Sequence, residues 1–233
     1  PQKRSIRSQR DMQRFVVGSR WMQDELVMNG IPEERVEVIH PIPASLSQIE
    51  PLPHQSECEI LYVGQVIRGK GVDLLLQALS RVTQPWHLTI VGTGNHLEYC
   101  RRLATSLGIA GQVEFAGWVP HRDLDQYYAR AAFTVVPSRW PEPFGMVGVE
   151  AMARGRAVVG FSAGGIPDWL CHGVNGLLAP AGDVESLAEA IGCLLGDPEQ
   201  ARRLGRRAAR VATNRFTHTG YLEAMQTLLE EVA

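Results

Sequence analysis

Two glutamates, Glu142 and Glu150, lie eight residues apart in the segment 137–153, where a proline-containing loop leads into a helical pattern. Helical side chains lean toward the N-terminus of their helix, so Glu150 is expected to point back toward the end that carries Glu142. The amides of residues 144–146 would be unsatisfied donors at that helix start. Carboxylates beside free amides suit a ligand with hydroxyls and a phosphate, such as a nucleotide sugar. The alternative is that both carboxylates only complement the helix dipole.

A second loop suited to an anion follows the apolar run 60–63, where residues 64–71 read GQVIRGKG and lead into a helical pattern. Its glycines let backbone amides approach a ligand closely, and the helix start adds positive potential. Arg68 and Lys70 are placed to neutralise a diphosphate. The loop is not a Walker P-loop, because Gly71 stands where Ser or Thr is required. The alternative is an ordinary glycine-rich turn with two solvated cations.

A third loop, at residues 92–97, begins like a dinucleotide fingerprint, but Leu97 stands in place of the third glycine. The loop does not follow the first strand of the sheet, and no acidic residue lies at the expected place about 20 residues further on. We therefore reject an oxidoreductase that binds a nicotinamide cofactor. A fourth glycine-rich loop, FSAGGIPD at 161–168, follows another strand-like run and adds to the same predicted edge.

The elements that position these loops alternate along the chain. Strand-like apolar runs lie at 60–63, 88–91, 113–115, 133–136, 158–161 and 177–178. Helical periods lie between or after them, at 72–79, 97–107, 124–131 and 184–195. This alternation predicts an α/β fold, a doubly wound Rossmann-like parallel sheet with helices on both faces. In such sheets ligands bind beyond the carboxyl ends of the strands, where the four loops lie.

The first fifty residues are organised differently. They contain a strand-like run at 15–17, a helical stretch at 20–29 and another run at 36–40, followed by four prolines between Pro41 and Pro53. We predict four parts of the chain on this basis. They are a remnant of another domain at 1–42 (its last strand–helix–strand), an interdomain linker at 43–55, a nucleotide-sugar donor-binding domain at 56–215, and a C-terminal helix at 216–233 that packs back toward the remnant.

Composition excludes several classes of protein. The 233 residues carry 23 Lys and Arg against 25 Asp and Glu, so no overall field attracts nucleic acid. A hydrophobic content of 45% does not fit a disordered chain, and no apolar stretch approaches the ~18–20 residues that span a bilayer. The chain begins with Pro1 and has no signal-peptide pattern, so we expect it to be part of a longer protein.

Cysteines, histidines and clustered cations receive less specific interpretations. Four scattered cysteines without a C-x-x-C pair are interpreted as reduced, mostly buried thiols, which indicates a cytoplasmic location. The histidines are interpreted as surface or packing residues: His40, His54, His87, His96, His121, His172 and His218. Basic clusters at 3–14 and 202–215 are interpreted as solvated faces. The alternative is that they contact an anionic lipid acceptor or the inner face of a membrane, as a peripheral protein does.

Together the loops resemble the C-terminal, donor-binding domain of glycosyltransferase family 4, whose members are retaining nucleotide-sugar glycosyltransferases of the two-domain GT-B fold. The E-x7-E motif within EPFGMVGVEAMARG is the strongest element, followed by GGIPD at 164–168, NGLL at 175–178 and GD at 182–183. The resemblance covers residues 59–195 almost continuously. The segment 15–41 is similar to the closing strand–helix–strand of the family's N-terminal domain.

The resemblance implies roles for individual residues. Glu150 would accept hydrogen bonds from the donor ribose, and Glu142 would hold the sugar hydroxyls with the amides of residues 144–146. Lys70, Arg68 and Glu142 would be the catalytic residues, with the cations stabilising the departing diphosphate. Gln65 departs from the family, which usually has Arg there. The implied donor-binding residues are Gly64, Gln65, Arg68, Lys70, Trp118 and Val119 (beside the base), Glu142, Phe144, Gly145, Met146, Val147 (beside phosphate and ribose) and Glu150.

The resemblance therefore implies a retaining hexosyl-type glycosyltransferase that moves a sugar from a nucleotide diphosphate donor, such as a UDP- or GDP-sugar, to an acceptor. No cofactor and no metal is expected. The acceptor, whether glycan, lipid or small molecule, is not indicated, and nucleic acid is not expected as a partner. Most of the N-terminal domain is not in this chain, so the alternative is a non-catalytic part that binds the nucleotide sugar and needs a separate acceptor domain.

Overall fold

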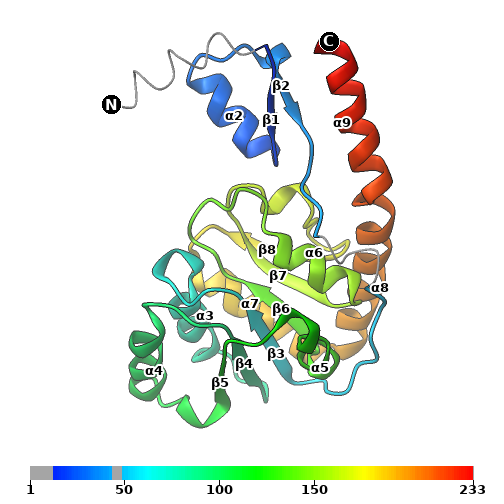
Figure 1. Cartoon of the computed structure of the whole chain (residues 1–233). Coiled ribbons are helices and arrows are strands. Elements are labelled where there is room, and N and C mark those ends of the chain that lie inside the picture. The colour runs from blue at the N-terminus through cyan, green and yellow to red at the C-terminus, as the bar shows by residue number, and fades with distance from the viewer. Residues whose placement is uncertain (1–12, 44–48, 233) are drawn as a thin grey trace.

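The computed structural model describes residues 13–43 and 49–232, which form two parallel sheets of different size (Figure 1). The small sheet pairs β1 (Phe15–Val17) with β2 (Val36–Val38). The large sheet has six strands, all parallel, in the order β5-β4-β3-β6-β7-β8. Its strands are β3 (Glu59–Val63), β4 (His87–Val91), β5 (Val113–Gly117), β6 (Phe133–Val136), β7 (Ala157–Ser162) and β8 (Gly176–Pro180).

The strand order reverses between β3 and β6. Ile60 of β3 pairs with Leu88 of β4 on one side and with Phe133 of β6 on the other. The chain winds outward from this centre in both directions, so the loops that follow β3 and β6 diverge to opposite faces. A crevice at the carboxyl ends of these two strands is therefore built into the topology.

Helices cover both faces of the large sheet. On one side α3 packs against α4 and α7, and on the other α6 packs against α8 (Figure 1). The predicted doubly wound α/β fold is thus confirmed. The helices are α2 (Arg20–Met28), α3 (Val72–Leu79), α4 (Leu97–Ser106), α5 (Asp125–Arg130), α6 (Met146–Ala153), α7 (Val184–Gly196), α8 (Pro198–Arg215) and α9 (His218–Val232).

The apolar periods identified in the sequence form the core. Val72, Leu75, Leu76 and Leu79 follow the i, i+3, i+4, i+7 spacing, and each is at most 1% exposed. Both faces of the sheet are covered, which explains why its strands are continuous apolar runs rather than alternating ones. Phe133 and Val135, for example, are as buried as Thr134 between them. This packing fixes the carboxyl edge on which the loops stand.

The N-terminal segment forms its own small cluster around Val17, Ile31 and Val36, beside the large sheet. Ser19 begins α2 by accepting a hydrogen bond from the amide of Met22 at 3.3 Å. The segment contacts the large domain through the amide of Arg20, which donates to a carboxylate oxygen of Asp168 at 2.8 Å.

Helix α9 extends from α8 to the level of β1 and β2 (Figure 1). Arg14, just before β1, donates to a carboxylate oxygen of Glu231 near the end of α9 at 3.1 Å. The C-terminal helix thus contacts the N-terminal segment through these two residues. No helix in the described ranges is both long enough and apolar enough to span a bilayer.

Some sequence expectations need correction or lie outside the described residues. The cysteines are not mostly buried: Cys100 is buried and Cys58 is partly buried, whereas Cys171 and Cys193 are exposed. Cys193 lies on α7, where its thiol donates to the side-chain oxygen of Gln200 at 3.1 Å. Apolar neighbours in the sequence did not reveal that these two positions face outward. The basic residues from 3 to 10, and residues 44–48 of the expected linker, lie outside the described part of the chain.

Candidate functional site

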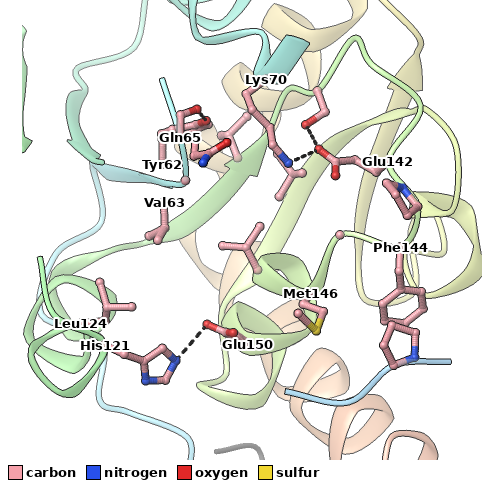
Figure 2. A pocket seen from close by; sticks show the side chains of 18 residues that line it. Tyr62, Val63, Gln65, Lys70, His121, Leu124, Glu142, Phe144, Met146 and Glu150 are labelled. Atoms are coloured by element: carbon pink, nitrogen blue, oxygen red, sulfur yellow. Dashed lines mark hydrogen bonds and ion pairs between the residues drawn. The ribbon is translucent and has the colours of Figure 1, made fainter. Parts of the chain in front are cut away.

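A cavity of about 540 Å³ opens at the carboxyl ends of β3 and β6, where the strand order reverses (Figure 2). Its walls come from the turn after β3, the loop between β6 and α6, and the first turns of α6. Pro41, which follows β2, adds to the lining from the N-terminal segment. The predicted crevice therefore exists, and two of the four loops identified in the sequence, at 64–71 and 137–153, line it.

Close packing brings the turn after β3 against the loop after β6. Gly71 has a φ of 70°, and a Cβ atom there would lie 1.9 Å from the carbonyl oxygen of Pro137. Only glycine fits that position. The amides of Arg139 and Trp140 both donate to the carbonyl of Gly69, at 3.1 and 3.0 Å. These contacts hold the two loops together. They also place the side chain of Lys70, which lies between Gly69 and Gly71 in the sequence, over the cavity.

Lys70 and Glu142 form an ion pair at one end of the cavity (Figure 2). The ammonium of Lys70 lies 2.6 Å from Oε1 of Glu142, and the hydroxyl of Ser138 donates to the same oxygen at 2.5 Å. The Glu142 side chain is only 8% exposed, so both bonds compensate a carboxylate held away from water. Lys70 is 31% exposed and can also reach a ligand in the cavity.

The backbone of Glu142 is held by the loop that follows β7. Its carbonyl accepts a hydrogen bond from the amide of Gly165 at 2.7 Å. At Gly164, with a φ of 59°, a Cβ atom would lie 2.3 Å from that same carbonyl oxygen. The glycine-rich loop at 161–168 therefore allows close approach of backbone to backbone, and its role here is to position Glu142.

Helix α6 presents its N-terminus to the cavity. The N-cap residue, Gly145, has a φ of 89° and provides no side-chain cap. The amide of Gly148 donates to the carbonyl of Gly145 at 3.0 Å, whereas those of Met146 and Val147 remain available as donors. The loop before the helix is fixed by Trp169, which is fully buried and whose indole donates to the carbonyl of Phe144 at 2.6 Å. This arrangement of free amides attracts an anion.

Glu150 lies one turn inside α6 and lines the same cavity as Glu142, as the sequence predicted. Its Oε2 atom lies 3.4 Å from Nε2 of His121, and its side chain is 15% exposed. Figure 2 shows this pair at the opposite end of the cavity from Lys70 and Glu142. His121 is exposed, in keeping with its interpretation as a surface residue, and the short turn His121–Asp123 that follows β5 also brings its imidazole to the lining of the cavity.

Trp118 and Val119 line a neighbouring cavity of about 350 Å³ at the ends of β4 and β5. The two cavities share the lining residues Val63, Gly64, Gln65 and Leu124. They therefore adjoin around the end of β3. Trp118 is 72% exposed, so its indole is accessible to a planar group. Lys70 lines the main cavity and Trp118 the neighbouring one, so the turn at Gly64 belongs to both binding surfaces.

Tyr62 was not identified in the sequence, although it lines the main cavity from the end of β3. Its hydroxyl donates to the carbonyl of Gln65 at 2.7 Å and so fixes the turn that leads to Lys70. Burial, and then the nearby carboxylate of Glu142, raises the pKa of Tyr62 above its ordinary value. The phenol therefore stays protonated and acts as a hydrogen-bond donor.

Of the predicted donor-binding residues, most line the main cavity and two line the adjoining one. Arg68 is exposed and, within the described residues, lines neither of them. Lining residues that were missed include Tyr62, His121 and Ser138. Their neighbours in sequence carry no pattern that marks a site, although Ser138 directly precedes the motif region. The residues that line the main cavity as predicted are Gly64, Gln65, Lys70, Glu142, Phe144, Gly145, Met146, Val147 and Glu150.

The described ranges hold no cluster of side chains arranged for a metal ion. Among these residues, no three His, Cys, Asp or Glu side chains gather as they would around a metal ion. The ionisable side chains that form ion pairs or close contacts in the main cavity are instead one lysine, two glutamates and one histidine, grouped in two pairs.

Comparison with known proteins gives consistent similarities. A model of the family described as glycosyl transferases group 1 matches residues 47–211. D-inositol 3-phosphate glycosyltransferase 1 of Catenulispora acidiphila is 33% identical over 239 aligned residues, covering 93% of this chain and 56% of that protein. Sucrose-phosphate synthase of Thermosynechococcus elongatus has a structure that matches with a TM-score of 0.85 and 28% identity, over 98% of this chain and 60% of that one.

A structure of Anabaena HepE in complex with UDP-glucose matches with a TM-score of 0.88 over 98% of this chain and 67% of that one. At 23% identity this likeness shows the fold alone. The chain spans about half, or less, of the length of the curated relatives it matches, from 18% to 56% among the first of them. Similarity to these proteins therefore covers one part of a larger architecture.

Proposed function

Since the chain belongs to the glycosyl transferases group 1 family, we propose that it is the donor-binding part of a retaining glycosyltransferase. The donor is a nucleotide diphosphate sugar, such as a UDP- or GDP-sugar, and transfer needs no metal ion. The observation that carries this proposal is the arrangement of the Lys70–Glu142 ion pair and the Glu150–His121 contact at opposite ends of one cavity, with a helix N-terminus between them. The acceptor is left open, because no observation selects one.

The cavity suits each part of such a donor. At one end, the ammonium of Lys70 and the amides at the start of α6 provide positive potential for a diphosphate. Glu142, at the same end, has a second carboxylate oxygen to accept hydrogen bonds from sugar hydroxyls. At the other end, Glu150 and His121 suit the hydroxyls of a ribose. The adjoining cavity at Trp118 and Val119 is placed for the base.

During transfer, the bond between the anomeric carbon and the diphosphate oxygen breaks, and a bond to the acceptor oxygen forms. The acceptor proton must leave with the diphosphate or through a base. Negative charge grows on the leaving diphosphate oxygen, which is the position that Lys70 and the amides of α6 face. Groups fixed before the reaction stabilise that charge without reorganising. We propose that this electrostatic role replaces the role of a metal ion.

A second candidate function, binding of the nucleotide sugar without transfer, is favoured by the lining of the donor cavity. A separate acceptor domain would then complete the site. The cavity is lined mainly by the donor-binding half together with Pro41 of the N-terminal segment, so binding and turnover need not occur in the same part.

Calorimetric titration of the chain with UDP-glucose, GDP-mannose, UDP and GDP, each with and without a chelator, tests donor binding. The proposal is supported if the chain binds at least one nucleotide sugar and its nucleoside diphosphate, and if this binding persists in the presence of the chelator. Release of free sugar from that donor, with water as the acceptor, separates transfer from binding alone. Proton NMR of the released sugar, recorded before its anomers equilibrate, tests retention of configuration. No binding of any of the four compounds contradicts the donor assignment.

A further inference from the structure

We propose that a second cavity, on the far side of α6 from the donor site, binds the phosphate group of another ligand. This cavity has a volume of about 450 Å³ and shares no lining residue with the donor cavity. It is formed by the second half of the expected linker, the turn that follows α6, and one face of α8. Its lining residues are Pro51, Leu52, His54, Gly155, Arg202, Arg206, Ala209, Arg210 and Thr213.

Three arginines of α8 point to this one cavity. Arg202, Arg206 and Arg210 are spaced at i, i+4 and i+8, which places them along one helix face. Like charges at this spacing repel each other and destabilise a helix when nothing neutralises them. A bound anion would remove that cost. The basic cluster at 202–215 thus places three of its arginines along one face of α8, where they line the cavity.

Only one of the three arginines is neutralised by carboxylates. Arg202 donates to Glu57 and to Glu199, each at 2.5 Å. Within the described ranges, no carboxylate lies within ion-pair distance of Arg206 or Arg210, and both are exposed. Two guanidinium groups on one face therefore offer several donors for phosphate oxygens, and such pairs bind phosphate in a forked geometry.

A further positive charge lies behind the lining of the cavity, where Arg156 donates to the carbonyl of the lining residue Leu52. Arg156 is fully buried and donates to the backbone carbonyls of Tyr128 at 2.5 Å and Pro53 at 2.7 Å. Its hydrogen-bond partners are backbone carbonyl oxygens and, among the described residues, include no carboxylate. Buried charges are ordinarily balanced by an opposite charge. Arg156 thus leaves this region with an unbalanced positive field next to the cavity.

The pKa of His54 is sensitive to the positive field of these arginines. Burial, followed by the charges of Arg156 and Arg202, lowers the pKa of His54 to about 4, although a hydrogen bond with the backbone of Gly155 acts in the opposite direction. Arg206 adds to the lowering. A dianion placed between Arg206, Arg210 and His54 would reverse the local potential. Protonation of the imidazole would then become favourable at higher pH.

The rest of the lining is apolar and selects a ligand with a phosphate at one end. Pro51, Leu52 and Ala209 contribute carbon surface, and the hydroxyl of Thr213 is already used by the carbonyl of Ala209 at 3.0 Å. A phosphate of a soluble metabolite and the phosphate of an anionic lipid headgroup share this chemistry. The experiment below therefore has one arm for each source.

The soluble arm is an NMR titration with inorganic pyrophosphate that follows the C2 proton of His54, assigned with His54→Gln. We expect a saturable shift, with the pKa of His54 rising on binding. In the Arg206→Gln/Arg210→Gln variant the affinity should fall by about tenfold or more. The matched control, Arg203→Gln/Arg207→Gln, removes two cations from the same helix outside the cavity and should bind as the wild type does. Thermal unfolding confirms that both variants are folded.

The lipid arm measures co-sedimentation with phosphatidylcholine vesicles with and without phosphatidylglycerol. Binding that requires phosphatidylglycerol and is lost only in Arg206→Gln/Arg210→Gln supports the site with a lipid phosphate as its source. A shift of the His54 signal on addition of pyrophosphate, without vesicle binding, supports the site with a soluble phosphate compound as its ligand. Absence of both, or equal losses in the two double variants, overturns the proposal. Because the readouts involve no donor sugar, these outcomes are independent of the proposed transferase function.

Discussion

The ammonium of Lys70 lies 2.6 Å from a carboxylate oxygen of Glu142, although the two residues follow different strands. Lys70 comes from the turn after β3, and Glu142 from the loop after β6, the two strands between which the sheet order reverses. Ser138 binds the same carboxylate oxygen at 2.5 Å. The pair therefore links the two diverging halves of the sheet at the point where the proposed donor binds.

Replacing Lys70 by alanine should slow donor turnover more than it weakens donor binding. The ammonium faces the charge that develops on the leaving diphosphate, and loss of one such electrostatic group costs about 10²–10³ in rate. Turnover and donor affinity are measured on the same preparation. Arg81→Ala is the control, because Arg81 forms an exposed pair with Glu185 outside the donor cavity. Near-normal turnover of the Lys70 variant would show that Lys70 is not a catalytic residue.

Replacing Arg68 by alanine should have a smaller effect than replacing Lys70. The resemblance gives both cations a catalytic role, but Arg68 is exposed and lies outside the lining of the two cavities, as described above. We expect a decrease in turnover of about threefold or less, as for a screened surface charge. The same turnover assay compares the Arg68 variant with the Lys70 variant. Equal losses in the two variants would show that the turn after β3 rearranges when the donor binds.

The sequence predicted the sheet and most of the cavity because both depend on local patterns. Apolar runs that end at glycine or proline mark buried parallel strands, and their carboxyl ends place Gly64, Lys70 and Glu142 on one edge. The sequence did not predict that His121 is the partner of Glu150. His121 lies in a short turn after β5, and only the order of the strands in space brings that turn to α6. Tyr62 was missed for a similar reason, since a tyrosine within a strand reads as core.

Replacing Glu150 by alanine should weaken donor binding by about tenfold or more, because hydrogen bonds to a charged group contribute about 1.5–3 kcal/mol each. His121→Ala should have a smaller effect, since the imidazole is half exposed and pairs with Glu150 at 3.4 Å. Calorimetric titration with the preferred nucleotide diphosphate measures both. Glu98→Ala is the control, a glutamate on α4 whose side chain is 74% exposed. Unchanged affinity in Glu150→Ala would contradict the ribose assignment.

Replacing Gly148 by alanine should destabilise the protein and disturb the loop that carries Glu142. A Cβ atom at position 148 would lie 2.0 Å from the ring of Trp169, which is fully buried and bonded to Phe144. Overpacking of this kind costs about 1–3 kcal/mol, which exceeds the gain of about 1 kcal/mol from replacing a helical glycine. Urea unfolding measures the loss.

Gly111→Ala is the matched control for that substitution, because no atom lies within 4 Å of a Cβ built at position 111. We expect its unfolding midpoint to stay near that of the wild type. Equal stability of the two variants would show that Trp169 moves aside at little cost. In that case the indole would not fix the start of α6, and donor affinity in Gly148→Ala should also remain unchanged.

The stability of the protein should fall between about pH 6.5 and about pH 4, in part because of His54. The groups around His54 are Arg156 beneath it, Arg202 and Arg206 on α8, and the backbone of Gly155. Together with burial they lower its pKa to about 4 in the folded chain. The unfolded chain takes up a proton near the ordinary pKa of about 6.5. The contribution of His54 is therefore complete above that pH and decreases as the pH falls toward the folded-state value.

His54→Gln removes this proton uptake and should reduce the loss of stability on acidification. Urea unfolding midpoints near pH 7 and near pH 5 measure the difference for the wild type and the variant. His218→Gln, an exposed histidine on α9, is the control and should retain the full pH dependence. If His54→Gln loses as much stability as the wild type over this interval, the imidazole does not lie in a positive field. The phosphate site proposed beside it would then lose one of its supports, because Arg206 and Arg210 would have to be neutralised by another group.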